Sequence, residues 1–141
     1  MSQYDEEMDS GLAAKVHHRL AAIYFELAYH NPESEVFIDS AHHYCLKVMQ
    51  NHRFTGDHNL RASTLIIEGA LYLLQENSQK AESKLLEALQ IYNQHNKKPD
   101  MSLYGNLSKV WIQLGKFDEA LTLALRFYDE MLMNDHLIGL I

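Results

Sequence analysis

The chain of 141 residues is 47% hydrophobic and 22% charged, which fits a single folded domain and excludes a disordered or collagen-like chain. Its net charge of −7, without a basic run, disfavours nucleic-acid binding, and its apolar runs fall short of the ~20 residues of a membrane-spanning helix. Only 6 glycines and 2 prolines are available for turns, so we expect one all-α domain over 1–141 rather than an all-β fold.

The N-terminal residues and the single cysteine bear on the compartment. Residues 1–7 are acidic, whereas a signal peptide begins with basic residues that an apolar stretch follows. Cys45 has no second cysteine with which to form an intrachain disulfide, which suits a reducing environment. We therefore expect a cytoplasmic protein.

Apolar residues recur at helical spacing in six segments that short breaks separate. The first break combines Asn31, a residue suited to capping, with Pro32, which the first turn of a helix tolerates. Later breaks fall at 54–57, 76–78, 96–100 and 115–116. In chain order, the predicted helices span 10–30, 33–51, 58–75, 78–95, 101–114 and 117–134.

Alanines mark an internal repeat along these helices. Ala41, Ala81 and Ala120 are separated by 40 and 39 residues, and each lies early in the second helix of a predicted pair. Upstream of each alanine, large and small residues follow a similar order. In the three pairs this order is His17-x2-Leu20-Ala21-x2-Tyr24, Leu65-x2-Glu68-Gly69-x2-Tyr72 and Tyr104-x2-Leu107-Ser108-x2-Trp111.

Small residues suit the places where two helices approach closely, and large ones fill the remaining gaps. We expect Gly69 and Ala81 to lie at such an approach. We also expect the aromatic side chains of Tyr72, Trp111 and Phe117 to be buried against alanines of the partner helix. Because 65–74 is apolar nearly all round, the middle pair is expected to have neighbours on several sides.

The pattern resembles the tetratricopeptide repeat (TPR), a helix–turn–helix unit of about 34 residues. The resemblance implies a right-handed α-α superhelix of three TPR-like hairpins, a fold in which each hairpin covers the next. The repeats would span about 10–52, 57–96 and 100–134, with a C-terminal tail at 135–141. The terminal proline of the family is missing, and the 39–40-residue spacing exceeds the usual period. Extended units of this kind are similar to those of bacterial TPR regulators and peptide sensors.

Histidines and the cysteine are the candidates for chemistry. None of the 9 histidines lie three or four residues apart, the spacing at which two side chains of one helix share a metal. The best metal candidate is Asp39 with His42 and Cys45, each one helical turn from the next. Cys45 occupies a packing position of the repeat, which indicates a buried thiol. We therefore predict no catalytic residue, no metal and no cofactor, with a metal-dependent enzyme as the less favoured alternative.

The resemblance implies a non-catalytic protein- or peptide-binding module, an adaptor or an interaction segment of a larger regulator. In this family the first helix of each hairpin lines a concave groove that binds extended peptides or helices. An amphipathic helix or apolar peptide with acidic ends would fit this groove. A peptide-sensing regulatory switch is the alternative, and Ile66, Ile67 and Leu73 fit helix packing equally well. The positions implied are His18, Arg19, Ala22 and Phe25, then Ile66, Ile67, Ala70 and Leu73, then Gly105, Asn106, Lys109, Ile112 and Gln113.

The last residues, 136–141, are apolar, whereas repeat proteins normally close with a polar helix. These residues fold back, or a second copy covers them, or the chain belongs to a longer array. Exposed apolar ends commonly mark association surfaces, so we expect a homodimer through this tail.

Overall fold

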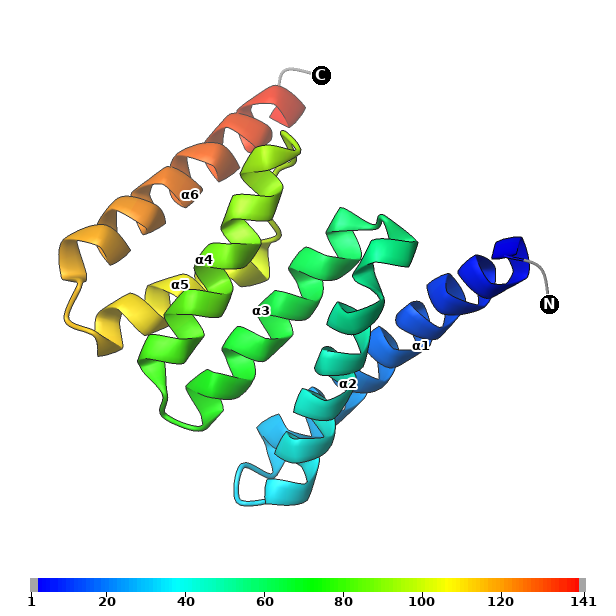
Figure 1. Ribbon diagram of the computed structural model, residues 1–141. Helices are drawn as coiled ribbons and strands as arrows, with labels where there is room; N and C mark the ends of the chain where they lie inside the picture. The colour runs from blue at the N-terminus through cyan, green and yellow to red at the C-terminus, as the bar shows by residue number, and fades with distance from the viewer. Residues whose placement is uncertain (1–2, 140–141) are drawn as a thin grey trace.

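Six helices in three antiparallel hairpins make up the part of the chain that the structure, a computed structural model, describes (Figure 1). Residues 3–139 are described, with side chains for 11–51 and 56–133. This part contains no strand, so the all-α prediction is confirmed. The helices are α1 (Gln3–His30), α2 (Glu35–Thr55), α3 (His58–Leu74), α4 (Ser78–Gln94), α5 (Met101–Gln113) and α6 (Phe117–Gly139).

The helix boundaries follow the sequence signals closely in the middle of the chain and depart from them at the ends. α1 begins at Gln3 rather than at residue 10, where the apolar periodicity starts. Carboxylates are favourable near the N-terminus of a helix, which suits the acidic segment 5–7 in the first turns of α1. α6 continues to Gly139, past the predicted end at 134. The apolar side chains of the tail, 136–141, on which the predicted homodimer depends, lie outside the described residues.

Polar side chains cap three of the helices. Asp57 accepts a hydrogen bond from the backbone N–H of Leu60 at 3.0 Å and thereby starts α3. Asn77 starts α4 and Asp100 starts α5 in the same way. Each cap satisfies a backbone donor that the first turn leaves without an intrahelical partner, so these residues fix where the helices begin.

The corner between the two helices of a hairpin is repeated in the structure. At the end of α3 the N–H of Asn77 donates to the carbonyl of Tyr72 at 2.8 Å, and at the end of α5 the N–H of Lys116 donates to Trp111 at 2.7 Å. One residue in each corner takes a positive φ, which Gly115 adopts without steric cost. The two corners are 39 residues apart. This spacing equals that of Ala81 and Ala120, and a corner of the same form also ends α4, where the N–H of Lys97 donates to the carbonyl of Tyr92 at 2.9 Å.

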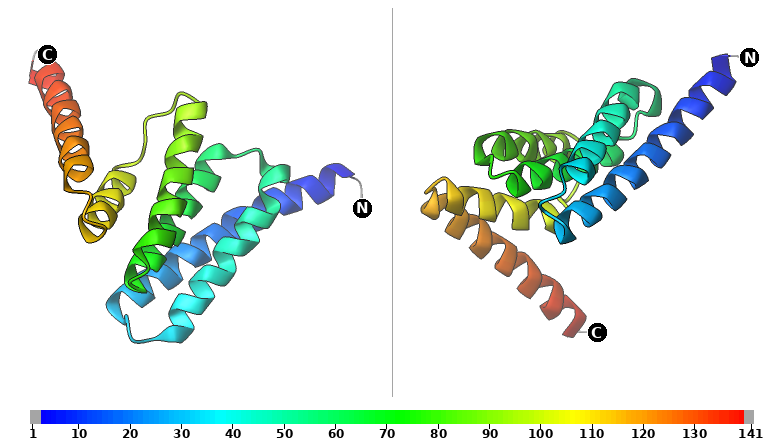
Figure 2. Two further views of the ribbon diagram at one scale, coloured as in Figure 1. Left: turned by 60° about the vertical axis from the view of Figure 1, so that its left-hand side comes forward. Right: turned by 90° about the horizontal axis from the view of Figure 1, so that it is seen from below.

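The hairpins stack in chain order (Figures 1 and 2). Within each hairpin the two helices pack together, and α2 then contacts α3 as α4 contacts α5. α1 also contacts α3, and α3 contacts α5. In the described chain, α2 does not contact α4, and α4 does not contact α6. The first helices of the hairpins therefore lie close together in a row, while the second helices are spread apart.

α3 is the centre of the core. One buried cluster joins its Leu65 to α4, α5 and α6, and a second joins its Leu71 to α1 and α2. Gly69 lies against the side chain of Leu85 in α4, as its place in the repeat predicts. Phe117 does not follow the prediction, because 64% of its surface is exposed. It is the first residue of α6, and no described helix packs on that side of α6. None of the described helices combines the length and the apolar character needed to cross a bilayer.

Candidate binding surface

The predicted site residues fall on the row of first helices, which we call the α1–α3–α5 face. On α1, Arg19, Ala22 and Phe25 follow one another every three residues, so they share one side of the helix. Arg19 is exposed, whereas Ala22 and Phe25 are half-buried. Phe25 packs against the cluster between α1, α2 and α3. This end of the face therefore offers a cation beside a partly covered apolar surface.

The middle of the face is more closed than the sequence suggests. Ile66 and Ala70 on α3 are only 5% and 7% exposed. Ile66 belongs to the core cluster that α5 completes, and Leu73 is half-buried against the same cluster. Ile67 is half-buried against the cluster of α1 and α2. The sequence allows these residues either to line a groove or to pack between helices. Ile66 and Ala70 pack between helices, and they expose little surface to a ligand.

The α5 end of the face is the most accessible. Lys109 and Gln113 are exposed, and 55% of the surface of Ile112 is exposed. Asn106 is half-buried and Gly105 is exposed on the same helix. The side-chain oxygen of Gln113 accepts a hydrogen bond from a serine hydroxyl of α4 at 2.6 Å, so this side chain is held in place. The face thus presents cationic and polar groups at both ends of a shallow apolar middle.

A hydrogen-bonded group that the sequence did not indicate joins α1 to α3. Nδ1 of His18 lies 3.1 Å from the hydroxyl of Thr64, and Nε2 of His18 lies 3.1 Å from the hydroxyl of Ser63. Thr64 donates its own proton to the carbonyl of Leu60 at 2.7 Å. It therefore accepts from Nδ1–H of His18, which leaves Nε2 to accept from Ser63. Neutral His18 satisfies every one of these bonds.

Burial lowers the pKa of His18 below its usual 6.5, and the neighbouring Arg19 lowers it further, against the opposing effect of Asp57. Because the folded state favours the neutral ring, the stability that His18 contributes is present above pH 6.5 and is lost as the pH falls below that value. We expect His18→Gln, which keeps a donor and an acceptor, to reduce the loss of unfolding free energy between pH 7.5 and pH 5. Urea denaturation at several pH values measures this. Parallel losses in both proteins would contradict the role of His18.

The three candidate metal ligands on α2 do not meet at one point. Cys45 is fully buried in the core, and burial raises the pKa of its thiol far above the usual range. His42 is hydrogen-bonded to Gln75 at 2.9 Å and packs against Tyr72, whereas Asp39 is exposed. Among the residues with described side chains, no group of three or more histidine, cysteine or acidic residues could hold a metal ion.

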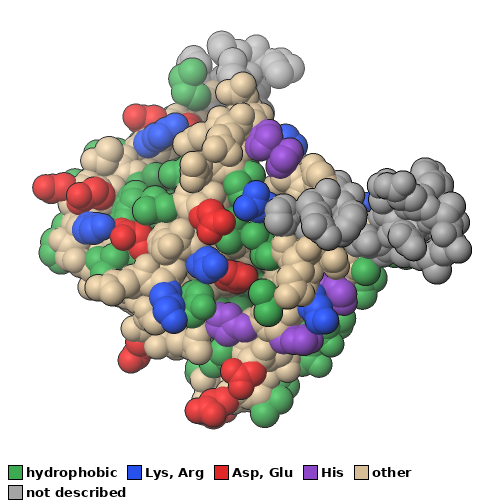
Figure 3. All heavy atoms as spheres, viewed as in Figure 1, with side chains coloured by type: hydrophobic (Ala, Val, Ile, Leu, Met, Phe, Trp, Pro, Cys, Tyr) green, Lys and Arg blue, Asp and Glu red, His purple; other side chains and the backbone are tan. Residues whose placement is uncertain are grey.

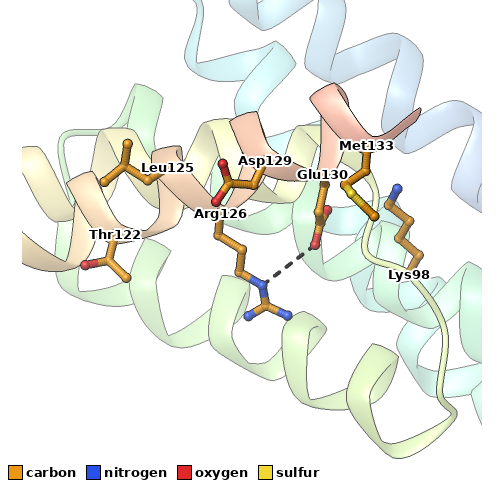
Figure 4. A pocket seen from close by; sticks show the side chains of 7 residues that line it. All are labelled: Lys98, Thr122, Leu125, Arg126, Asp129, Glu130 and Met133. Carbon is orange, nitrogen blue, oxygen red and sulfur yellow. Dashed lines mark ion pairs between the residues drawn. The ribbon is translucent and has the colours of Figure 1, made fainter. Parts of the chain in front are cut away.

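A hollow lies beside α6, away from the predicted site. A cavity of about 600 Å³ is lined by Thr122, Arg126 and Glu130 of α6 and by Lys98 of the loop before α5 (Figure 4). Arg126 reaches from α6 toward α4, with its Nε 3.7 Å from Glu130 Oε1. A second cavity, of about 480 Å³, shares Thr122 and Arg126 and extends to Trp111. Acidic residues outnumber basic ones in the lining of both cavities together, so this hollow does not suit an acidic ligand.

Opposite charges alternate on the side of the molecule that α2 and α4 form (Figure 3). Glu68 of α3 is buried and lies 3.1 Å from Nζ of Lys84. Glu82 accepts hydrogen bonds from Nζ of Lys116 at 2.7 Å and from the indole N–H of Trp111 at 2.9 Å. These contacts join α4 to α3, to α5 and to the corner before α6. Helix packing therefore accounts for these charged residues, and no ligand is needed to explain them.

No protein-family model, curated protein or solved structure matches this chain.

Proposed function

We propose that this chain is a non-catalytic module of three TPR-like hairpins that binds a protein or peptide on its α1–α3–α5 face. In this proposal the hairpins form a right-handed superhelix, and the α1–α3–α5 face is its concave side. The module acts as an adaptor or as an interaction segment of a larger regulator, and binding involves no turnover.

The packing of the helices is the observation that carries the proposal. First helices that contact one another, beside second helices that do not, bend a stack of hairpins toward the first helices. The repeated corners of the last two hairpins, 39 residues apart, support a common unit. A row of parallel first helices also presents one continuous surface, which is how helical repeats bind extended ligands.

The charges on the face favour an acidic ligand. Lys15 and Arg19 are exposed on α1, and Lys109 is exposed on α5, although the whole chain carries a net charge of −7. Exposed Ile112 and half-buried Phe25 supply apolar contacts near these cations. An amphipathic helix or apolar peptide with acidic residues toward its ends complements this arrangement, with the apolar contacts giving affinity and the charges giving orientation.

Selection of a displayed library of random peptides against the purified chain tests the proposal. We expect the enriched peptides to combine acidic residues with apolar residues at helical spacing. Their affinity for the double variant Arg19→Glu, Lys109→Glu should fall about tenfold or more, because both ends of the face then repel the ligand. Fluorescence anisotropy with labelled peptides measures this.

A variant with the same type of charge change elsewhere is the control. Lys47 is exposed on α2, outside the α1–α3–α5 face, and Lys47→Glu is expected to leave peptide affinity unchanged. Enriched peptides that bind all variants equally would contradict the proposed site.

A further inference from the structure

Exposed apolar side chains form a stripe along α6. Its members recur every three or four residues, so they lie on one side of the helix. Phe117, Leu121 and Tyr128 are 64%, 60% and 59% exposed, which is unusual for residues of this size in one row. The C-terminal stripe consists of Phe117, Leu121, Leu125, Tyr128 and Leu132.

A second stripe runs along α1, at the other end of the stack, where hydrophobic side chains follow the free edge of the molecule (Figure 3). Leu12 is 65% exposed, and Val16 and Ile23 are each 49% exposed. They face away from the side of α1 that packs on α2 and α3, where Ala14 and Ala21 are fully buried. The N-terminal stripe consists of Leu12, Val16, Ile23 and Leu27.

Several members of the C-terminal stripe repeat positions of α4 that contact the next hairpin. The residue 39 positions before Leu121 is Glu82, which accepts the hydrogen bond from Trp111 of α5. The residue 39 positions before Tyr128 is Leu89, which packs in the same core cluster as Trp111. The exposed side of α6 therefore corresponds to the side of α4 that contacts the following hairpin.

The N-terminal stripe repeats positions of α3 that contact the preceding hairpin. In the register that aligns the tyrosines of α1 and α3, Ile23 corresponds to Leu71 and Leu27 corresponds to Gln75. Leu71 packs in a core cluster with α2, and Gln75 is hydrogen-bonded to His42 of α2. The two stripes are thus the two halves of an interface that already occurs twice within the chain, between α2 and α3 and between α4 and α5.

When the two stripes are paired, the charges beside them are opposite at one end. Helices that meet in the internal interfaces are antiparallel, so α6 against a second α1 would bring the Tyr128 region of one stripe to the Val16 region of the other. Asp129 is exposed beside the former, and Lys15 is exposed beside the latter. Opposite charges at this end favour the pairing of unlike stripes over the pairing of two copies of α6.

We propose that copies of this chain stack head to tail, with the C-terminal stripe of one copy on the N-terminal stripe of the next. The occupant of each stripe is a second copy, and the contact continues the order of the hairpins across the boundary. Because the two surfaces differ, a dimer leaves one C-terminal stripe and one N-terminal stripe unpaired. Further copies therefore add at both ends of the stack. The stacking contact and the α1–α3–α5 face share Lys15, an exposed cation of α1.

Sedimentation velocity of the full chain over a range of concentrations tests the stacking. We expect the average mass of the wild type to rise with concentration beyond twice its 16.3 kDa. The variant Leu121→Glu, Tyr128→Glu should stay at the monomer mass, and so should Val16→Glu, Ile23→Glu. An equal mixture of the two variants should form a dimer and stop there, because each retains one intact stripe.

The exposed apolar residues Val36 and Leu46 of α2 lie outside both stripes, and Val36→Glu, Leu46→Glu should associate as the wild type does. Circular dichroism checks the fold, and the neutral variants Ile23→Gln and Leu121→Gln replace any glutamate variant that unfolds. A wild type that stays monomeric at all concentrations overturns the stacking. So does a variant of a single stripe that still dimerises alone, because that result shows two like stripes pairing.

Discussion

Replacing Gly69 by alanine is expected to lower the free energy of unfolding by about 1–2 kcal/mol, although alanine is the better helix former. A Cβ atom at this position would lie 2.6 Å from Cγ of Leu85 and 2.7 Å from one of its methyl carbons. Leu85 is fully buried in the cluster between α3 and α4, so it cannot move aside without disturbing its neighbours. The overpacking, about 1–3 kcal/mol, therefore outweighs a gain in helix propensity of about 1 kcal/mol.

Gly105 provides the matched control in α5. It also lies inside a helix, and nothing lies within 4 Å of the position that its Cβ would take. Gly105→Ala is expected to raise the free energy of unfolding by about 0.5–1 kcal/mol, since only the helix propensity changes. Urea denaturation at 25 °C measures both variants.

A double-mutant cycle identifies the cause. Leu85→Ala alone removes buried contacts and is expected to cost about 2–5 kcal/mol. In that background Gly69→Ala should no longer destabilise, because the colliding side chain is gone. Equal losses from Gly69→Ala with and without Leu85 would show that the approach of α3 and α4 is not the reason for the glycine.

The helices and their corners could be predicted because their signals are local. Asp57 and Asp100 cap the helices that follow them through hydrogen bonds to N–H groups two or three residues away, and such bonds need no tertiary partner. Gly69 could also be assigned to a close helix approach, because the repeat places it opposite the second helix of its own hairpin. In each of these cases the partner lies within the same or the next helix.

The accessibility of the candidate site could not be predicted in the same way. Ile66 has the same spacing whether it lines a groove or packs on α5, and only the position of a neighbouring hairpin decides between them. Phe117 has the pattern of a buried aromatic residue, but the side of α6 that it occupies has no described neighbour. The bonds of His18 to Ser63 and Thr64 join residues more than 40 positions apart, so no local pattern indicates them.

Removing the charge of Lys84 is the second substitution with a large expected effect. Glu68 is only 8% exposed, and Nζ of Lys84, at 3.1 Å, compensates its charge across α3 and α4. Lys84→Met keeps the length of the side chain and leaves the buried carboxylate without its partner. The free energy of unfolding should fall by about 1–3 kcal/mol, less than for a fully buried pair because water reaches the lysine.

The double variant Glu68→Met, Lys84→Met separates the cost of an unpaired charge from the loss of packing. With both charges replaced by apolar groups, stability should return to within about 1 kcal/mol of the wild type. Arg126→Met is the control, because Arg126 pairs with Glu130 at 3.7 Å on an exposed part of α6, and about 0.5 kcal/mol or less is expected. A double variant as unstable as Lys84→Met would instead assign the loss to the lysine stem, which covers apolar surface between the two helices.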